Sequence, residues 1–198
     1  SSQLEQNNTF SQVLKRKRLE KKRTLEELAQ GICSPSYLSK IENAIVKVDE
    51  YYYQLLFEKL DIPFEDMKKE RDSNLFQNLI RNYLINNKSE IEAIVNRTIK
   101  MDLYCETEIE LIVLFSNIIQ GSYDEAKILI NKIEDIRNSL TNKELLFFFF
   151  STLYFYKTNQ SDRARQQAQV LVEINYDDMF LKAAVYDLAA DIFYVIGN

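Results

Sequence analysis

The sequence contains no histidine, and it has only three glycines, two prolines and two cysteines. Without histidine the chain cannot form imidazole general bases, Ser-His or Cys-His nucleophile pairs, or histidine metal sites. Cys33 and Cys105 are too few and too far apart for a disulfide framework or a thiolate zinc site, and they favour a reducing cytoplasm. The scarcity of glycine and proline, with abundant Leu, Ile, Glu and Lys, predicts an almost entirely helical protein.

Long hydrophobic segments are also missing. The longest apolar stretch, 145–156, has twelve residues, whereas a helix needs roughly 20 to span a bilayer. Residues 1–9 are polar and lack the basic and apolar regions of a secretory signal. We therefore expect a cytoplasmic protein without a membrane partner.

The net charge of −5 is unevenly distributed. Residues 1–47 carry 9 Lys and Arg against 5 Asp and Glu, a sum of +4, and residues 48–198 carry 16 against 25, a sum of −9. A basic region followed by an acidic body is expected of a polyanion-binding module attached to a part that stays away from the polyanion. The alternative is an ordinary solvated charged face.

Three short helices are predicted in the basic region. The first carries seven basic residues between Lys15 and Arg23 and ends near Lys22. Its inward face is predicted to be a loose apolar stripe, Phe10, Val13, Leu14 and Leu19. Thr24 and Glu27 form a capping box for the second helix, and Gly31 suits the left-handed conformation at its exit. Ser34 caps the third helix, with Pro35 at its first position, and this helix extends to about Asn43.

The third helix has two different faces. Leu38 and Ile41, with Ile45 just beyond the helix, are predicted to point inward. On the other side, hydroxyls and one cation permit close approach to base edges and phosphates. The face therefore suits the major groove of DNA, although a helix pair joined by a short turn also occurs as plain packing.

The segment 24–43, TLEELAQGICSPSYLSKIEN, resembles the helix-turn-helix of phage repressors, and most closely the variant in the peptide-sensing PlcR and Rgg regulators. Its short turn, 31–34, is similar to the PlcR side of the family, and Leu25 stands where many repressors have glutamine. The resemblance implies that Ala29, Ile32, Leu38 and Ile41 are core residues. It also implies that seven residues meet DNA, with Arg18 and Thr24 on the backbone: Arg18, Thr24, Ser34, Ser36, Tyr37, Ser39 and Lys40.

A fourth helix is predicted from about Val48 to Leu60. Its many tyrosine, leucine and phenylalanine side chains exceed what so small a domain can bury, so we expect some of them to meet a second chain or the body. Pro63 ends this segment, because it disfavours helix in the residue before it. The predicted domains are a helix-turn-helix domain at 1–63, a connecting segment at 64–72 and helical repeats at 73–198.

The body repeats a similar helix break at a fixed interval. The break Gly121–Ala126 recurs as Asn159–Ala164, and Gly197 follows Asn159 at the same spacing. Each break follows an apolar helix, and the first two precede an amphipathic one. The pattern predicts an α-solenoid of stacked helical hairpins, with a looser first pair at 73–101.

These hairpins resemble tetratricopeptide repeats, and a helix-turn-helix followed by such repeats is the layout of the PlcR and Rgg family. The family resemblance implies a peptide groove lined by the first helix of each pair. We expect Phe147–Phe150 to be buried on all sides, the alternative being an aromatic ligand groove. Since nothing covers the apolar last helix, we also expect the natural chain to continue past Asn198, or a partner to cover this end. The polar candidates for peptide contact, each of which could also be an ordinary solvated residue, are Asn82, Asn117, Tyr154, Asp187 and Asp191.

Together these features predict a transcription regulator without catalytic residues, metal or other cofactor. It would bind double-stranded DNA as a homodimer and respond to a signalling peptide, as the resemblance implies. The alternative is an interaction protein whose repeats restrain a cytoplasmic enzyme, without specific DNA binding. An enzyme is disfavoured because acidic pairs such as Asp187 and Asp191 have no accompanying base, metal constellation or phosphate loop.

Overall fold

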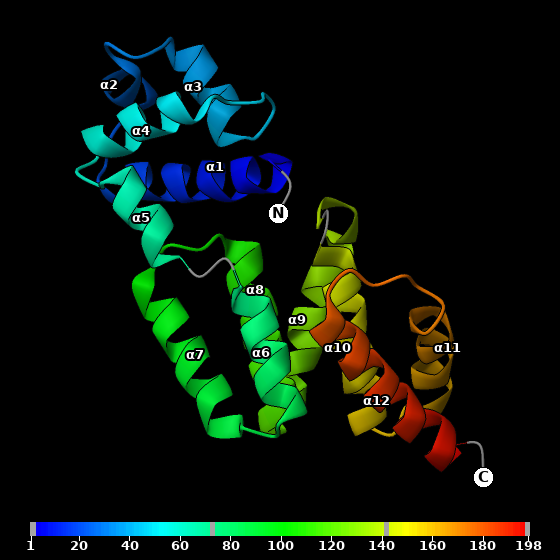
Figure 1. The fold of residues 1–198 in the computed structure, drawn as a ribbon. Helices are drawn as coiled ribbons and strands as arrows, with labels where there is room; N and C mark the ends of the chain where they lie inside the picture. The colour runs from blue at the N-terminus through cyan, green and yellow to red at the C-terminus, as the bar shows by residue number, and fades with distance from the viewer. Residues whose placement is uncertain (1–2, 72–73, 141–142, 197–198) are drawn as a thin grey trace. The chain divides into compact units, whose positions relative to one another are not determined.

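The computed structural model describes residues 3–71, 74–140 and 143–196, and every regular element in these ranges is a helix (Figure 1). The predicted all-α fold class is confirmed. The elements are α1 (Gln3–Glu20), α2 (Leu25–Ala29), α3 (Pro35–Glu42), α4 (Glu50–Lys59), α5 (Phe64–Glu70), α6 (Leu75–Leu84), α7 (Lys88–Met101), α8 (Glu106–Gln120), α9 (Tyr123–Asp135), the 3-10 turn η1 (Arg137–Ser139), α10 (Glu144–Lys157), α11 (Ser161–Leu171) and α12 (Met179–Ile196).

The chain forms two compact units. The head consists of residues 1–73 together with 101–106, and the body consists of 74–100 and 107–198. The head therefore includes α5, which the sequence suggested as a connecting segment, and it includes the loop between α7 and α8. No sequence pattern indicated that this loop belongs to the head, because the body segment 74–100 separates it from the rest of that unit.

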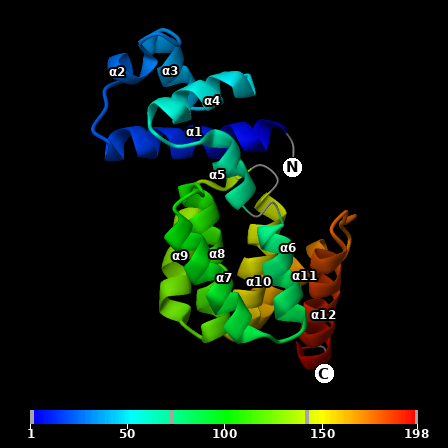
Figure 2. The same cartoon turned by 60° about the vertical axis from the view of Figure 1, so that its left-hand side comes forward.

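The head is built around α1, which packs against α3 and α4 (Figure 2). An aromatic cluster fills its core: the Phe10 ring lies 5.0 Å from that of Phe64, and the Phe57 and Phe64 rings stack at 5.4 Å. Because α5 supplies Phe64 and packs on α4, the head itself buries Tyr53, Leu56, Phe57 and Leu60. Much of the α4 surface that we expected to need a second chain or the body is thus covered within this unit, while Tyr51 stays 61% exposed.

Two inward-facing predictions for the head were wrong. Leu19 is 55% exposed and Ile45 is 71% exposed. Leu19 falls on the outer side of α1, since the buried positions Leu14 and Arg18 follow each other at the helical spacing of four residues. Ile45 lies beyond α3, after a left-handed residue at Ala44 (φ 55°) that turns the chain away from the helical path.

The body consists of paired helices whose boundaries follow the sequence pattern closely. Gly121 has φ of 80°, a left-handed conformation that glycine adopts without strain, between α8 and α9. Phe115 of α8 stacks on Phe150 of α10 with ring centroids 4.7 Å apart. Phe147, Phe149 and Phe150 are almost fully buried and Phe148 is half-buried, so the aromatic run is core.

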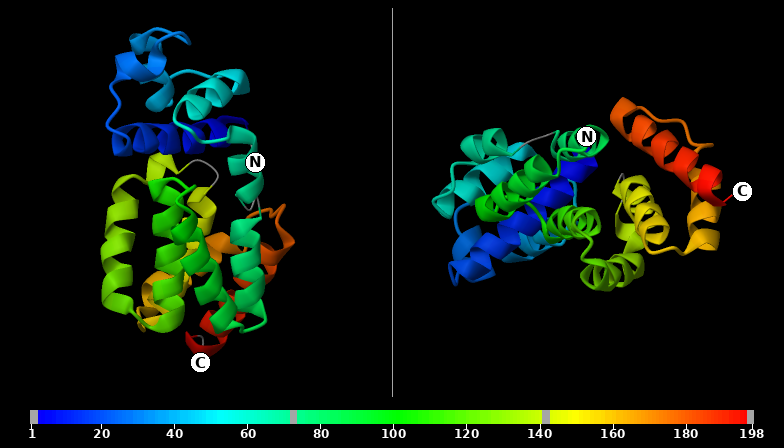
Figure 3. Two further views of the ribbon diagram at one scale, coloured as in Figure 1. Left: turned by 90° about the vertical axis from the view of Figure 1, so that its left-hand side faces the viewer. Right: turned by 90° about the horizontal axis from the view of Figure 1, so that it is seen from below.

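One packing contact departs from a simple solenoid, in which each repeat touches only its neighbours. α12 packs against α11 and α10, and it also packs against α6, the first helix of the body (Figure 3). Tyr83 of α6 in turn makes ring contacts with Phe115 and Phe149. The first helices of the predicted pairs therefore meet in a shared aromatic core.

Within the described ranges, none of the helices combines the length and apolarity that crossing a membrane requires.

Candidate nucleic-acid interface

Side-chain caps fix the starts of both α2 and α3. Thr24 Oγ1 accepts from the Glu27 amide at 3.1 Å and Glu27 Oε2 accepts from the Thr24 amide at 3.3 Å, which completes the predicted capping box. Gly31 has φ of 82°. Ser34 Oγ then accepts from the Tyr37 amide at 3.0 Å to start α3. These contacts set the direction in which α3 leaves the turn.

The inner face of α3 is fully packed and its outer face is open. Leu38 and Ile41 are buried, and Ser34, Ser36 and Lys40 are exposed. The outer face therefore consists of short hydroxyls and one cation, which can approach a nucleic acid closely.

Two of the predicted contact residues are half-buried at the edges of this face. The Tyr37 ring lies 5.6 Å from that of Tyr52 on α4, and Ser39 accepts through its carbonyl from Asn43 Nδ2 at 2.8 Å. Thr24, at the start of α2, is exposed, although its hydroxyl is engaged in the capping box. All six of these residues keep a surface position beside or on α3.

Arg18 lies inside the head, with 7% of its surface exposed. Its Nε donates to both carboxylate oxygens of Glu42 on α3, at 3.0 and 2.8 Å, and its Nη1 donates to the Arg23 carbonyl at 2.7 Å. The hydrogen bond to Glu42 raises the pKa of Arg18. The expected contact with the DNA backbone does not fit this burial, and we assign Arg18 instead to holding α1 against α3. The pairing of Arg18 with Glu42 had no local sequence signal, because the two residues lie in different helices with α2 between them.

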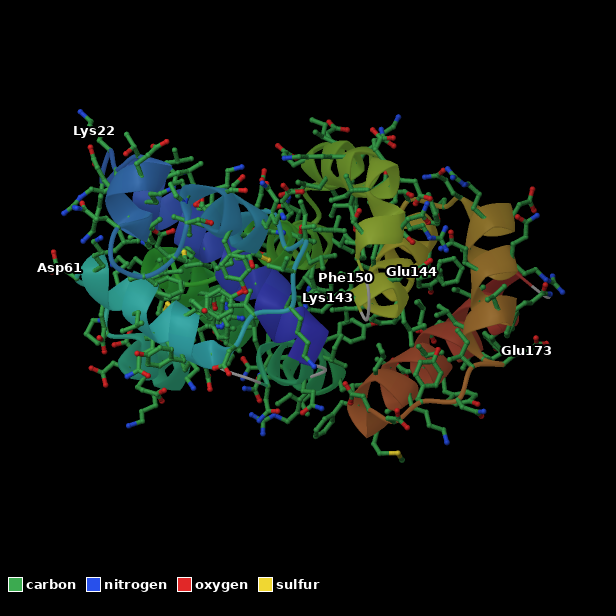
Figure 4. All side chains as sticks on the ribbon, turned by 90° about the horizontal axis from the view of Figure 1, so that it is seen from above. Lys22, Asp61, Lys143, Glu144, Phe150 and Glu173 are labelled. Carbon is green, nitrogen blue, oxygen red and sulfur yellow. The ribbon has the colours of Figure 1, made fainter. Side chains whose placement is uncertain are left out.

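Five of the other cations of 15–23 fall into two groups, three that bind acceptors of the protein and two that are exposed at the end of the segment. Arg16 and Lys17 bind the loop between α7 and α8, and Lys21 donates to the Leu60 carbonyl. Lys22 and Arg23 are exposed at the end of α1, and Figure 4 shows Lys22 projecting from the head. The basic run is thus partly structural, and its exposed end adjoins the turn that leads to α2.

Burial raises the pKa of the Cys33 thiol, which is half-buried in the turn before α3. The thiol is therefore neutral at pH 7 and adds no negative charge beside α3. Among the described residues, no group of three or more His, Cys, Asp or Glu could hold a metal ion.

The residues proposed for peptide contact are spread over four helices of the body. Asn82 is buried, and its Nδ2 donates to the Asn78 carbonyl of the same helix at 2.8 Å; Tyr154 is also buried, with its ring 6.4 Å from that of Tyr123. Asn117 is half-buried, and Asp187 and Asp191 are exposed on α12. Both acids lie near Tyr83, whose pKa is raised first by burial and then by their charges.

Comparison with known proteins identifies the head. A family model described as helix-turn-helix matches residues 14–67, which include α2, α3 and α4. Residues 14–67 are a helix-turn-helix domain. The N-terminal part of the resemblance is therefore confirmed, and this family points to a DNA-binding protein.

Similarity also extends to a solved structure. The chain is similar to the crystal structure of Bacillus thuringiensis PlcR in complex with the peptide PapR7 and DNA, with 15% identity and a TM-score of 0.49. The match covers 96% of this chain and 74% of the PlcR chain. No curated protein matches the sequence significantly.

Proposed function

We propose that the chain is a cytoplasmic transcription regulator whose α3 reads the major groove of double-stranded DNA. The observation that carries the proposal is the outer face of α3, where Ser34, Ser36 and Lys40 are exposed on a helix fixed by two capped turns within a helix-turn-helix domain. Tyr37, Ser39 and Thr24 lie at the rim and supply further hydroxyls. Lys22 and Arg23 supply exposed positive charge for the phosphates.

The protein would act as a homodimer on a pseudo-palindromic operator. Two identical heads then place two copies of α3 in successive major grooves, about 34 Å apart along the duplex. Because that spacing tolerates little error, any change in the distance between the heads changes operator affinity.

The body would supply control by a short signalling peptide. This part of the proposal rests on the resemblance of segment 24–43 to the PlcR and Rgg regulators and on the helical hairpins that follow it. Asn117, Asp187 and Asp191 remain the proposed polar contacts, since Asn82 and Tyr154 have little exposed surface. A peptide would shift the population between two arrangements of the dimer.

Lys40→Glu tests the DNA interface. Binding sites are first selected from a random DNA pool with the full chain, and affinities of variants for the selected duplex are then measured. Lys40→Glu replaces an attractive charge on the outer face of α3 by a repulsive one, so we expect a loss of affinity of about tenfold or more. Lys127→Glu, which makes the same charge change at an exposed position of α9, is the matched control.

Equal loss of affinity in both variants, or selection of no DNA by the wild type, would exclude sequence reading by α3. Retention of a protein partner by Lys40→Glu, without any DNA binding by the wild type, would favour the interaction-protein alternative. Repeating the selection with cell-free culture filtrate tests control by a peptide. Such control requires that the affinity for DNA in the presence of the filtrate differs from the affinity in its absence.

A further inference from the structure

The loop between α7 and α8 is held by three cations of the head. Arg16 Nη1 donates to the Tyr104 carbonyl at 2.9 Å, and its Nη2 donates to the Asp102 carbonyl at 3.1 Å and pairs with Asp102 Oδ1 at 3.1 Å. Lys17 Nζ pairs with Asp102 Oδ2 at 2.5 Å, and Arg71 Nη1 donates to the Leu103 carbonyl at 2.5 Å. Charged donors thus bind three of the loop's backbone carbonyls and its one carboxylate.

The loop is also part of the head's core. Leu103, Tyr104 and Cys105 are each less than a tenth exposed. The Arg71 guanidinium lies 4.4 Å from the centroid of the Tyr104 ring and 5.6 Å from that of Phe10, so it links the loop to α1. Since the surface ion pairs of Asp102 are half-exposed and individually weak, the buried residues and the charged bonds to carbonyls fix the loop.

This loop is too short to absorb a movement of the helices at its two ends. Four residues, 102–105, connect the last residue of α7 to the first of α8, and Asp102 turns the chain with φ of 55°. Because both flanking helices belong to the body, the chain passes between the head and the body three times, near residues 73, 100 and 106. A shift of the ends of α7 and α8 must therefore pull on the loop and on the cations that hold it.

The contacts of α1 extend from this loop to α3. Lys17 and Arg18 are adjacent, and Arg18 is fixed to Glu42 of α3 by two hydrogen bonds. We propose that loop 102–105 is the coupling element through which the state of the helical repeats reaches α3. The proposal rests on the proposed function for the role of α3, whereas the coupling itself is independent of DNA.

Arg16→Gln tests the coupling in the full chain. It removes one positive charge and the bonds to Asp102 and Tyr104, whereas the control Lys15→Gln removes one positive charge from an exposed neighbouring position. By differential scanning calorimetry, we expect the wild type and Lys15→Gln to unfold in a single transition. Arg16→Gln should separate the unfolding of head and body into two transitions, because it loosens the loop of the head whose two ends continue into α7 and α8 of the body. Asp102→Asn, which keeps the buried residues, should give a smaller separation in the same direction and decides the question if Arg16→Gln fails to fold.

A duplex selected from a random pool extends the test to α3. Binding stabilises whichever units are coupled to the binding site. The duplex should raise the single midpoint of the wild type, and in Arg16→Gln it should raise only the transition of the head. Two transitions in the wild type, or a single transition in Arg16→Gln and Asp102→Asn with the same midpoint as Lys15→Gln, would overturn the coupling. If the proposed DNA function is wrong, the duplex shifts no midpoint, but the separation of transitions between wild type and Arg16→Gln is still observed.

Discussion

At the scale of single residues, the Arg18–Glu42 pair shows that part of the basic segment stabilises the fold of the head. Both side chains are buried, and together they join α1 to α3. Removing one member of a buried ion pair leaves the other charge without compensation and costs about 3 to 5 kcal/mol. We therefore expect Arg18→Met to destabilise the head by that amount, measured as the opening free energy of α1 and α3 amides in hydrogen exchange.

The double variant Arg18→Met/Glu42→Leu provides the control for this prediction. It removes both charges and keeps apolar volume, so it should be markedly more stable than Arg18→Met alone. Lys15→Met, at an exposed position, should change the opening free energy by less than about 0.5 kcal/mol. If the double variant is as unstable as the sum of its single variants, the two side chains do not act as a pair.

Tyr53 makes the stability of the head depend on pH in the alkaline range. Its hydroxyl shares a 2.8 Å hydrogen bond with Ser11, and burial raises the pKa of Tyr53 to about 12. The unfolded chain loses this proton near pH 10 and the folded chain near pH 12, so the contribution to stability is complete below pH 10 and is lost as the pH rises to about 12. The loss between these values is about 2 kcal/mol.

Urea denaturation followed by circular dichroism at pH 9 to 12 measures this loss. Tyr53→Phe cannot ionise at this position, and its stability should fall less steeply with pH than that of the wild type. The comparison is needed because burial also raises the pKa of Tyr83 and Tyr176 in the body. Tyr53→Phe should also be less stable at neutral pH, since the buried Ser11 hydroxyl loses its partner. Parallel pH profiles for the two proteins would contradict the assignment.

At the scale of elements, local signals in the sequence predicted most of the helix boundaries. Caps at Thr24 and Ser34 and the left-handed Gly31 act within a few residues, so they can be read directly from the sequence, and α2 and α3 begin where these residues require. The two faces of α3 followed from helical periodicity in the same way. The repeat interval of the body located the breaks before α9 and α11 because each hairpin repeats the same local pattern.

Contacts between distant segments could not be predicted in this way. Neither the pairing of Glu42 with Arg18 nor the place of loop 102–105 in the head leaves a local pattern in the sequence. Arg16 and Lys17 belong to the basic segment that predicts a polyanion-binding surface, and in the structure they hold that loop. For the same reason, the sequence could not show that Asn82 and Tyr154 would be buried or that α12 would pack against α6.

At the scale of the whole molecule, the separation of charge between head and body predicts how DNA binding depends on salt. Each phosphate that a Lys or Arg neutralises releases counterions, which adds about −0.9 to the slope of log affinity against log salt concentration. Lys22, Arg23 and Lys40 are exposed in the head, whereas Arg16, Lys17 and Arg18 are occupied by protein acceptors. The triple variant Lys22→Gln/Arg23→Gln/Lys40→Gln should therefore reduce the slope by about 2 to 3.

A matched triple variant in the body distinguishes local phosphate contact from the effect of net charge. Lys127→Gln/Lys157→Gln/Arg165→Gln removes the same three charges from exposed positions on α9, α10 and α11. Its affinity at moderate salt can fall slightly, but its slope should match that of the wild type, because counterion release requires contact with phosphates. Titrations of a fluorescent duplex between low and moderate salt measure both slopes, and equal reductions in the two triple variants would show that the exposed cations of the head do not contact the DNA backbone.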